Sequence, residues 1–178
     1  MPPKIRLVKP SLRRSAEFLA AVARSKALHG EWVSPPATEA SLARNLARFK
    51  NPTHVGYWII TESGKLAGVI NINEIVRGTF SSAYLGYYAF APHHRHGYML
   101  RGLAAVISLA FRKLRLHRLE ANIQPRNEPS RKLVQRLGFR LEGFSPRYLK
   151  IAGKWRDHER WALTIEDWRA YKEVKTSR

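Results

Sequence analysis

One stretch of this chain constrains the fold more than any other: the segment from Leu85 to Leu116 joins an aromatic-rich run, a basic turn and a long amphipathic run. Residues 85–91 end at Pro92 and have the length and composition of a strand. After Gly97, apolar residues recur with the i, i+3, i+4, i+7 spacing of one helix face, at Leu100, Leu103, Ala104, Ile107, Phe111 and Leu114. The segment therefore predicts a strand that leads through a tight turn into a helix N-terminus.

A helix N-terminus of this kind can bind a phosphate group. Its first backbone N–H groups have no partner within the helix, and the helix dipole adds partial positive charge there. Gly97 removes the Cβ where an anion would approach, and His94, Arg95 and His96 add side-chain donors. The same pattern occurs in α/β proteins that bind no phosphate, so an ordinary strand-to-helix connection is the alternative at this stage.

The charge of the chain limits its partners. Against 32 Lys and Arg there are 13 Asp and Glu, which gives a formal net charge of +19. Such a field attracts polyanions, including RNA and phosphorylated cofactors, and repels polycationic small substrates. A basic proteome or a solubility device is the alternative explanation. The absence of cysteine excludes disulfides, thiolate metal sites and a cysteine nucleophile.

The length of 178 residues suits one domain, 1–178, because no internal repeat, low-complexity run or flexible linker interrupts the sequence. The first ten residues contain no apolar leader, and no apolar run reaches the length of a membrane span. We therefore expect a cytoplasmic protein that does not contact a membrane.

The remaining patterns predict a mixed α+β fold. Strand patterns occur at residues 5–8, 54–61, 65–76, 83–91, 117–124, 139–151 and 155–164, and helix patterns at 12–28, 38–50, 98–116, 127–138 and 165–175. An antiparallel front thus precedes a parallel pair, 83–91 and 117–124, around the central helix. Neighbouring parallel strands that splay open a cleft at their carboxyl ends. Trp32, in a Pro-rich loop, either forms a lip of this cleft or packs in the core.

Several motifs resemble the GNAT family of acyl-CoA N-acyltransferases, in the family's order: LGYYAF, the turn ending in HGYML, LHRLEANIQPRN, RKLVQRLGF, LEG and GKWRDHERWAL. The pairing of HRLEANIQPRNEPS with GKWRDHERWALTIEDW is most similar to the RimJ/RimL branch, whose members acetylate the N-terminal α-amine of ribosomal proteins. The resemblance implies the GNAT fold, a mainly antiparallel mixed sheet with a splayed parallel pair flanked by helices. It also implies acetyl-CoA as the acetyl donor.

The resemblance places the pyrophosphate of acetyl-CoA at residues 94–99. Gly97 alone matches the family's pattern strictly, and the other positions are His94, Arg95, His96, Tyr98 and Met99. His94 stands where the family has Gln or Arg, and Met99 stands where it has a small residue. Arg95 would substitute as a donor, and the helix terminus supplies the backbone donors.

The pantetheine arm would, by the same resemblance, pair with the backbone of Tyr88, Ala89 and Phe90 like an added strand. Asn127 and Ser130 match the family's P-x-N-x-x-S and would hold the arm from the other side. A plain helix N-cap is the alternative role for Asn127.

Acetyl transfer needs a neutral amine, and a protein N-terminus, with a pKa of about 7.7 to 8.0, is far easier to deprotonate than lysine at about 10.4. A carboxylate acting through one water would suffice. Glu120 is the first candidate because it aligns with a catalytic glutamate of the RimI-type enzymes, with an ion pair to Arg118 as the alternative. Glu74 is the second candidate.

A proton donor for the departing thiolate is also required. The tyrosine that would supply it in related enzymes falls at Val134, so Ser130 is the replacement that the RimL pattern suggests, with Tyr148 as another hydroxyl. The glutamate base of RimL has no counterpart in residues 145–148, which predicts a mechanism that uses ordered water. The backbone N–H near Phe90 is the simplest oxyanion donor.

His93, His94 and His96 form a poor metal-ligand set, since all three lie in one short turn without a carboxylate nearby, and no metal is expected. The expected acceptor is a protein or peptide N-terminus, a ribosomal one starting with Ala or Ser, with electrostatic contact to RNA. The alternatives are a small-molecule amine acceptor, or a ribosome- or RNA-binding factor that retains the fold. Monomer and homodimer are both open.

Overall fold

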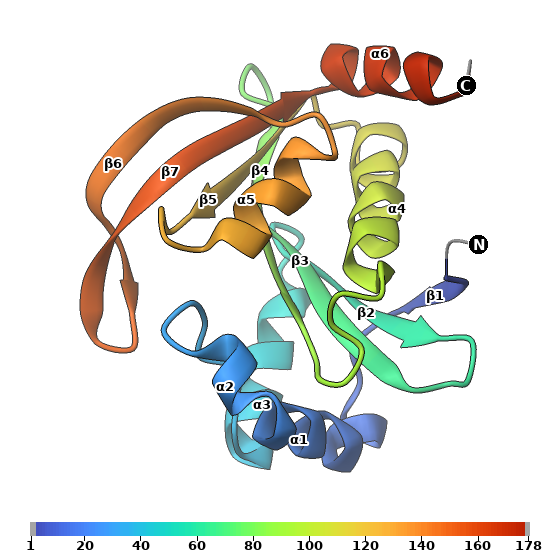
Figure 1. Ribbon diagram of the computed structural model, residues 1–178, viewed down its shortest axis with the longest axis vertical. Coiled ribbons are helices and arrows are strands. Elements are labelled where there is room, and N and C mark those ends of the chain that lie inside the picture. Colours follow the sequence, from blue (N-terminus) through green and yellow to red (C-terminus); the bar gives the residue numbers. More distant parts are fainter. Residues whose placement is uncertain (1–2, 177–178) are drawn as a thin grey trace.

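The computed structural model describes residues 3–176. Across these residues the chain forms one mixed sheet with helices against both faces (Figure 1). The strands are β1 (Ile5–Val8), β2 (Val55–Thr61), β3 (Leu66–Val76), β4 (Ser82–Ala89), β5 (Arg118–Ile123), β6 (Arg140–Ile151) and β7 (Lys154–Thr164). The helices are α1 (Ser15–Arg24), α2 (Lys26–His29), α3 (Glu39–Ala47), α4 (Tyr98–Arg112), α5 (Glu128–Gln135) and α6 (Ile165–Thr176), with 3₁₀ turns η1 (Leu12–Arg14) and η2 (Arg48–Lys50).

The strand order is β1-β2-β3-β4-β5-β7-β6, and within the described residues β4 and β5 are the one parallel pair. This confirms the predicted mixed α+β fold. The prediction of a single domain over 1–178 includes residues 1–2 and 177–178, which lie outside the described range, and it stays a prediction. No helix within residues 3–176 has both the length and the apolar character that crossing a bilayer would require.

Two apolar cores hold the sheet from opposite faces. On one face, Leu103 and Ile107 of α4 are fully buried in a cluster shared with β3, β5 and α5. On the other face, Phe18 of α1 and Leu42 of α3 pack against β2, where the Phe18 ring stacks on Trp58 at 5.2 Å between centroids. Burying a side chain of this size is worth about 1.5–3 kcal/mol, so both helical layers are fixed to the sheet.

The splay between the parallel strands is confirmed. β4 pairs with β5 only from Ser82 to Tyr84, opposite Arg118 to Glu120. Beyond Tyr84 the two strands separate, because β5 continues in register with β7 while β4 continues with β3. The carboxyl-terminal half of β4 therefore has an edge without a neighbouring strand.

The helix predicted over residues 12–28 is divided. Ser11 caps η1 rather than a long helix, and Ser25 separates α1 from α2. The buried Ser25 hydroxyl donates to the carbonyl of Ala21 at 2.7 Å and accepts the N–H of Ala91 at 2.9 Å. A serine side chain that bonds backbone in this way competes with helical hydrogen bonds. The break ties α2 to the chain that leaves β4.

Candidate active site

A cavity of about 910 Å³ lies where β4 and β5 separate. Its wall is formed by β4, the loop before α4, the start of α5, the end of β5, the β6–β7 hairpin and the chain around α2. Of the residues predicted for the site, those that line this cavity are Glu74, Tyr88, Ala89, His94, Arg95, Gly97, Met99, Asn127, Ser130 and Tyr148. Within the described part of the chain, the predicted residues that do not line it are Phe90, His96, Tyr98 and Glu120.

The N-terminus of α4 faces this cavity. Gly97 is its N-cap with φ 81° and ψ −4°, a left-handed conformation that glycine adopts without a Cβ penalty. Among the described residues no side chain caps the helix, and its first turn carries no acidic residue, so its first N–H groups have no side-chain partner there. Arg95, two residues earlier, also has a positive φ of 62°. A non-glycine residue held in this region is strained, and such strain is concentrated at binding sites.

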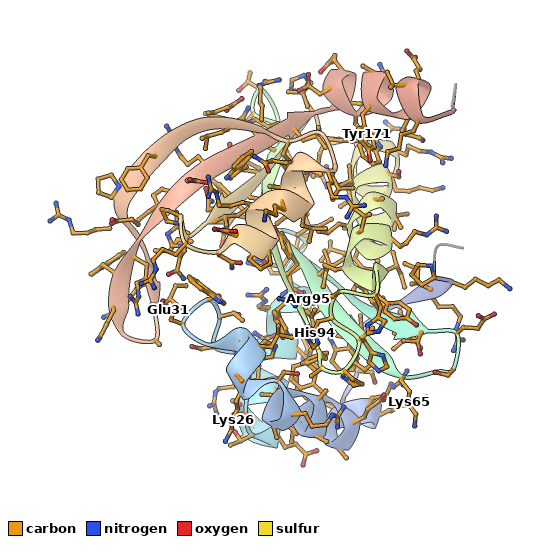
Figure 2. All side chains as sticks on the ribbon, viewed as in Figure 1. Lys26, Glu31, Lys65, His94, Arg95 and Tyr171 are labelled. Atoms are coloured by element: carbon orange, nitrogen blue, oxygen red, sulfur yellow. The ribbon has the colours of Figure 1, made fainter. Side chains whose placement is uncertain are left out.

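The side chains of the turn divide into two groups. His94 lines the cavity, and its Nδ1 is buried without a hydrogen-bond partner among the described residues. Figure 2 shows His94 and Arg95 in the loop between β4 and α4. His96 is exposed and bonds the His94 carbonyl at 2.8 Å, whereas the ring of Tyr98 packs edge-on against His93. His94 and Arg95 are therefore the side chains available to an anion here.

Met99 fits its unexpected place because of a glycine in the sheet below it. A Cβ on Gly68 of β3 would lie 2.7 Å from the Met99 Cε, closer than real contacts allow. The absence of that Cβ gives the methionine room over the sheet. The long side chain of Met99 at this turn position can therefore be packed only because β3 has a glycine beneath it.

The backbone of β4 offers different groups from those predicted. The N–H of Phe90 donates to the carbonyl of Ala67 at 2.9 Å, and the Phe90 ring is fully buried. Backbone N–H groups alternate between the two edges of a strand. The N–H of Tyr88 therefore also points toward β3, whereas the N–H groups of Tyr87 and Ala89 point into the splay. The Phe90 N–H is thus engaged in the sheet and is not free to act as an oxyanion donor, and the N–H groups directed into the splay are those of Tyr87 and Ala89.

The start of α5 brings two hydroxyl groups together. Asn127 is the N-cap, accepting the N–H of Ser130 at 3.2 Å, so the N-cap role considered for it is real, and it also lines the cavity. The Ser130 hydroxyl shares a hydrogen bond of 2.6 Å with the phenol of Tyr87. Burial raises the pKa of Tyr87 far above its usual value, which keeps the phenol protonated. Sequence reasoning missed Tyr87, although its alternation with Ala89 along β4 was a usable signal.

The carboxylate of Glu120, the first candidate for the general base, does not line the cavity. Glu120 accepts from Nε of Arg118 at 2.9 Å, and the same guanidinium is ion-paired with Glu142. The ion pair that was the alternative role for Glu120 is therefore present. Glu74 lines the cavity at its rim, with φ 50° and its carboxylate 3.3 Å from Nε2 of His54.

The hairpin formed by β6 and β7 contributes Tyr148 and a histidine that sequence reasoning missed. The register shifts between Ser145 and Leu149, and Arg147 in this bulge has φ 48°, with its N–H bonded to the Asp157 carboxylate at 2.7 Å. A bulge redirects side chains locally, and here Tyr148 faces the cavity with its ring 6.1 Å from that of His158.

His158 is 3% exposed and lines the cavity. Its Nδ1 donates to the carbonyl of Arg156 at 2.9 Å, because a carbonyl can only accept, so Nε2 of the neutral ring carries the lone pair. Burial lowers the pKa of His158 below its usual value, against the opposing effect of that hydrogen bond. The ring is therefore neutral at pH 7.

Two further polar side chains complete the wall. His29 of α2 is buried, and its Nε2 donates to the Ala89 carbonyl at 2.9 Å. Burial lowers the pKa of His29 as well. Asn122 of β5 lines the cavity with a buried amide oxygen that has no partner among the described residues. An unpartnered buried acceptor is costly unless a ligand or water supplies the donor.

Residues 3–176 contain no group of three or more His, Cys, Asp or Glu side chains arranged to hold a metal ion. The wall combines backbone N–H groups, hydroxyls, amides and imidazoles with the cationic side chains of Arg95, Lys132 and Arg136, and this set suits an anionic or acyl ligand rather than a cation.

The sequence is similar to that of known acetyltransferases. Residues 4–140 match the family model described as an acetyltransferase (GNAT) domain. The chain belongs to the GNAT family. Over 104 residues this GNAT chain is 42% identical to the ribosomal protein uS5-alanine N-acetyltransferase of Escherichia coli (strain K12), an alignment that covers 58% of this chain and 54% of that enzyme. The chain thus spans about half the length of this curated relative.

Solved GNAT structures extend the comparison. Mycobacterium smegmatis RimJ in complex with CoA-disulfide has a TM-score of 0.86 at 26% identity, over 97% of this chain and 88% of that chain. Spermidine N-acetyltransferase from Vibrio cholerae in complex with CoA and spermine has a TM-score of 0.79 at 16% identity, over 93% of this chain and 98% of that chain. The second likeness concerns the fold alone. The GNAT fold alone therefore does not determine whether the acceptor is a protein or a polyamine. That specificity depends on the side chains that line the cavity.

Proposed function

We propose that this GNAT protein transfers the acetyl group of acetyl-CoA to the α-amine of a protein N-terminus, with a ribosomal protein beginning with Ala or Ser as the acceptor. The observation that carries the proposal is the cavity at the splay, which has an uncapped helix N-terminus at one side and a polar chamber with neutral histidines at the other. The identity with the uS5-alanine N-acetyltransferase supports the acceptor, and the net charge of +19 disfavours polyamines.

The residues of the donor side fit acetyl-CoA. The unpartnered Nδ1 of His94, the Arg95 guanidinium and the N–H groups after Gly97 would hold the pyrophosphate. The free edge of β4 at Ala89 would pair with the pantetheine arm, together with Asn127. Acetyl-CoA supplies the activated acyl group, and the Tyr87 N–H would stabilise the negative charge that develops on the acetyl oxygen.

Ser130 is the proposed proton donor to the departing thiolate. Its hydroxyl lines the cavity and is held by the Tyr87 phenol at 2.6 Å. When the Tyr87 phenol donates to Ser130, the Ser130 hydrogen is free to pass to the thiolate, and water in the cavity then replaces the proton that Ser130 has lost. Tyr148, on the β6–β7 hairpin, is another hydroxyl-bearing residue that lines the cavity.

His158 is the proposed proton acceptor for the amine, directly or through one water. It is neutral, its tautomer is fixed by the Arg156 carbonyl, and the Asn122 amide oxygen lies in the same wall to accept an N–H from the amine. Glu74 remains a second candidate at the rim. We place Glu120 behind both, since its carboxylate is engaged by Arg118 outside the cavity.

The test is thiol release from acetyl-CoA with short peptides that have a free Ala or Ser N-terminus, against the same peptides with a blocked N-terminus and a free lysine. We expect turnover with the free α-amine and none with lysine alone. Turnover confined to small amines would contradict the protein acceptor, and silence with every amine would contradict the enzyme. The RNA contact, the oligomeric state and the cytoplasmic location stay predictions.

A further inference from the structure

The excess of positive charge is not explained by membership of the GNAT family, and part of it is gathered on one element. We define the basic arm as residues 144–156, the distal half of the β6–β7 hairpin. It contains Arg147, Lys150, Lys154 and Arg156 and no Asp or Glu. Figure 1 shows this hairpin curving away from the sheet, with its tip beside the chain that follows α2. The arm thus borders the acceptor side of the splay.

A second cavity, of about 380 Å³, lies between the basic arm and the chain after α2. Trp32 and Gln124 line both this cavity and the main one, so the two are adjacent. Its remaining wall includes Trp155, which is 60% exposed, and Arg126. A polypeptide whose first residue occupies the main cavity could leave it through this second one and pass along the arm.

The two carboxylates of the second cavity are already engaged. Glu31 is ion-paired with Arg156 at 3.1 Å, and Figure 2 shows Glu31 at the end of α2 that approaches the hairpin. Asp157 accepts the backbone N–H of Arg147 at 2.7 Å. In the described part of the chain, no carboxylate is ion-paired with the exposed cations Arg126, Lys150 and Lys154. The second cavity itself thus carries two cations, Arg126 and Arg156, and two carboxylates, and the surplus of positive charge lies on the adjoining basic arm, at the exposed Lys150 and Lys154.

We infer that the acceptor is an acidic polypeptide, whose residues after the N-terminal one run through the second cavity and along the basic arm. The inference rests on the proposed function and adds the class of acceptor. A polypeptide is favoured over RNA as the occupant because the second cavity adjoins the main one at Trp32 and Gln124 and is walled by the arm at Trp155 and Arg156, so a chain leaving the main cavity would reach the arm directly. Two tryptophans, Trp32 and Trp155, give that exit apolar walls suited to side chains.

The experiment compares two peptides that share a free Ala N-terminus and differ at residues 4–8, which are Glu-rich in one and Lys-rich in the other. We expect kcat/KM to be about tenfold higher for the acidic peptide, through KM, and the ratio to fall at high salt. Lys150→Glu combined with Lys154→Glu should reverse the preference. Both side chains are exposed, so the substitutions leave the core untouched, and Lys150→Gln with Lys154→Gln gives a milder form that abolishes it.

The matched control is Arg112→Glu with Lys113→Glu, an equal charge change at the exposed C-terminal end of α4. It should retain most of the preference for the acidic peptide. A control that reverses the preference as strongly as the arm variant would overturn the inference, because the effect would then come from net charge.

Equal kcat/KM for both peptides in the unaltered protein would overturn the inference while leaving the proposed function intact. Turnover of neither peptide would contradict the proposed function itself, which separates the two failures. Binding of a short single-stranded RNA that the Lys150 and Lys154 substitutions abolish, in a protein indifferent to peptide charge, would overturn the inference and assign the arm to RNA.

Discussion

The two ends of the active-site cavity are built in different ways. The proposed donor end relies mainly on backbone, namely the left-handed Gly97, the N–H groups of α4 and the free edge of β4, with His94 and Arg95 beside it. The proposed acceptor end consists of side chains that come from α2, β5 and the β6–β7 hairpin, namely His29, Asn122 and His158. Backbone groups are positioned by the fold itself and can bind the donor that its members share, whereas the side chains at the other end would determine which amine reacts. The two ends should therefore respond differently to substitution.

The largest effect is expected at the acceptor end. His158→Ala should lower kcat by about 10²–10⁴-fold, the usual contribution of a general base, with the affinity for acetyl-CoA unchanged. His158→Asn can keep a donor to the Arg156 carbonyl and should be equally inactive, which separates the proton transfer from the fold. Imidazole in solution should restore part of the activity of His158→Ala. Full activity in both variants would exclude His158 as the general base and make Glu74 the first candidate for that role.

The next effect is expected at the donor end. Gly97→Val places a β-branched residue at φ 81° and should weaken acetyl-CoA binding about 100-fold, measured by calorimetry. Gly64→Val is the matched control, since Gly64 has φ 83° in the β2–β3 turn with open space around it. Both variants should lose similar thermal stability, and only Gly97→Val should lose the ligand. Unchanged affinity would remove the turn from the pyrophosphate site.

Ser130→Ala tests the proposed proton donor. It should lower kcat about tenfold and leave both KM values nearly unchanged, because the hydroxyl acts on the leaving group. Tyr87→Phe removes the other hydroxyl of the pair and should give a smaller loss, since Ser130 can then bond water. A greater loss in Tyr87→Phe than in Ser130→Ala would make the tyrosine the direct donor.

A stability experiment probes the acceptor end without substrate. Burial lowers the pKa of His29, whose ring packs against Tyr88 and Phe90, so protonation is disfavoured in the folded state. Its contribution to stability is present above its unfolded pKa of about 6.5 and is lost as pH falls through the lower folded value. His29→Gln should therefore flatten the decrease in unfolding free energy between pH 7 and pH 5. An unchanged pH profile would contradict the buried, neutral assignment.

The smallest effect is expected for Glu120→Gln, for which the family resemblance and the structure predict different results. Glu120→Gln was expected from the family resemblance to lower turnover, whereas the ion pair with Arg118 predicts a change of kcat below about threefold. Steady-state kinetics with a peptide acceptor decides between the two. A loss of tenfold or more, without a change in acetyl-CoA affinity, would restore Glu120 as the base.

Local patterns determined much of this protein. Alternation and helical spacing placed the strands and helices, and the element order around α4 predicted the splay and the turn that leads into α4, because these features depend on neighbours in sequence. The division of the first helix was missed, since Ser25 ends it through a bond to Ala91, far along the chain.

The tertiary structure alone decided which polar side chains share the cavity. Glu120 and Asn122 lie on the same face of β5, and only the packing of Arg118 and the separation of β4 send one into an ion pair and the other to the cavity wall. His158 acquires its neutral state from burial under a bulge held by Asp157. Burial and charge pairing are sums over distant segments, so the local sequence determined the turn and helix of the proposed donor end, and only the fold decided which side chains form the proposed acceptor end.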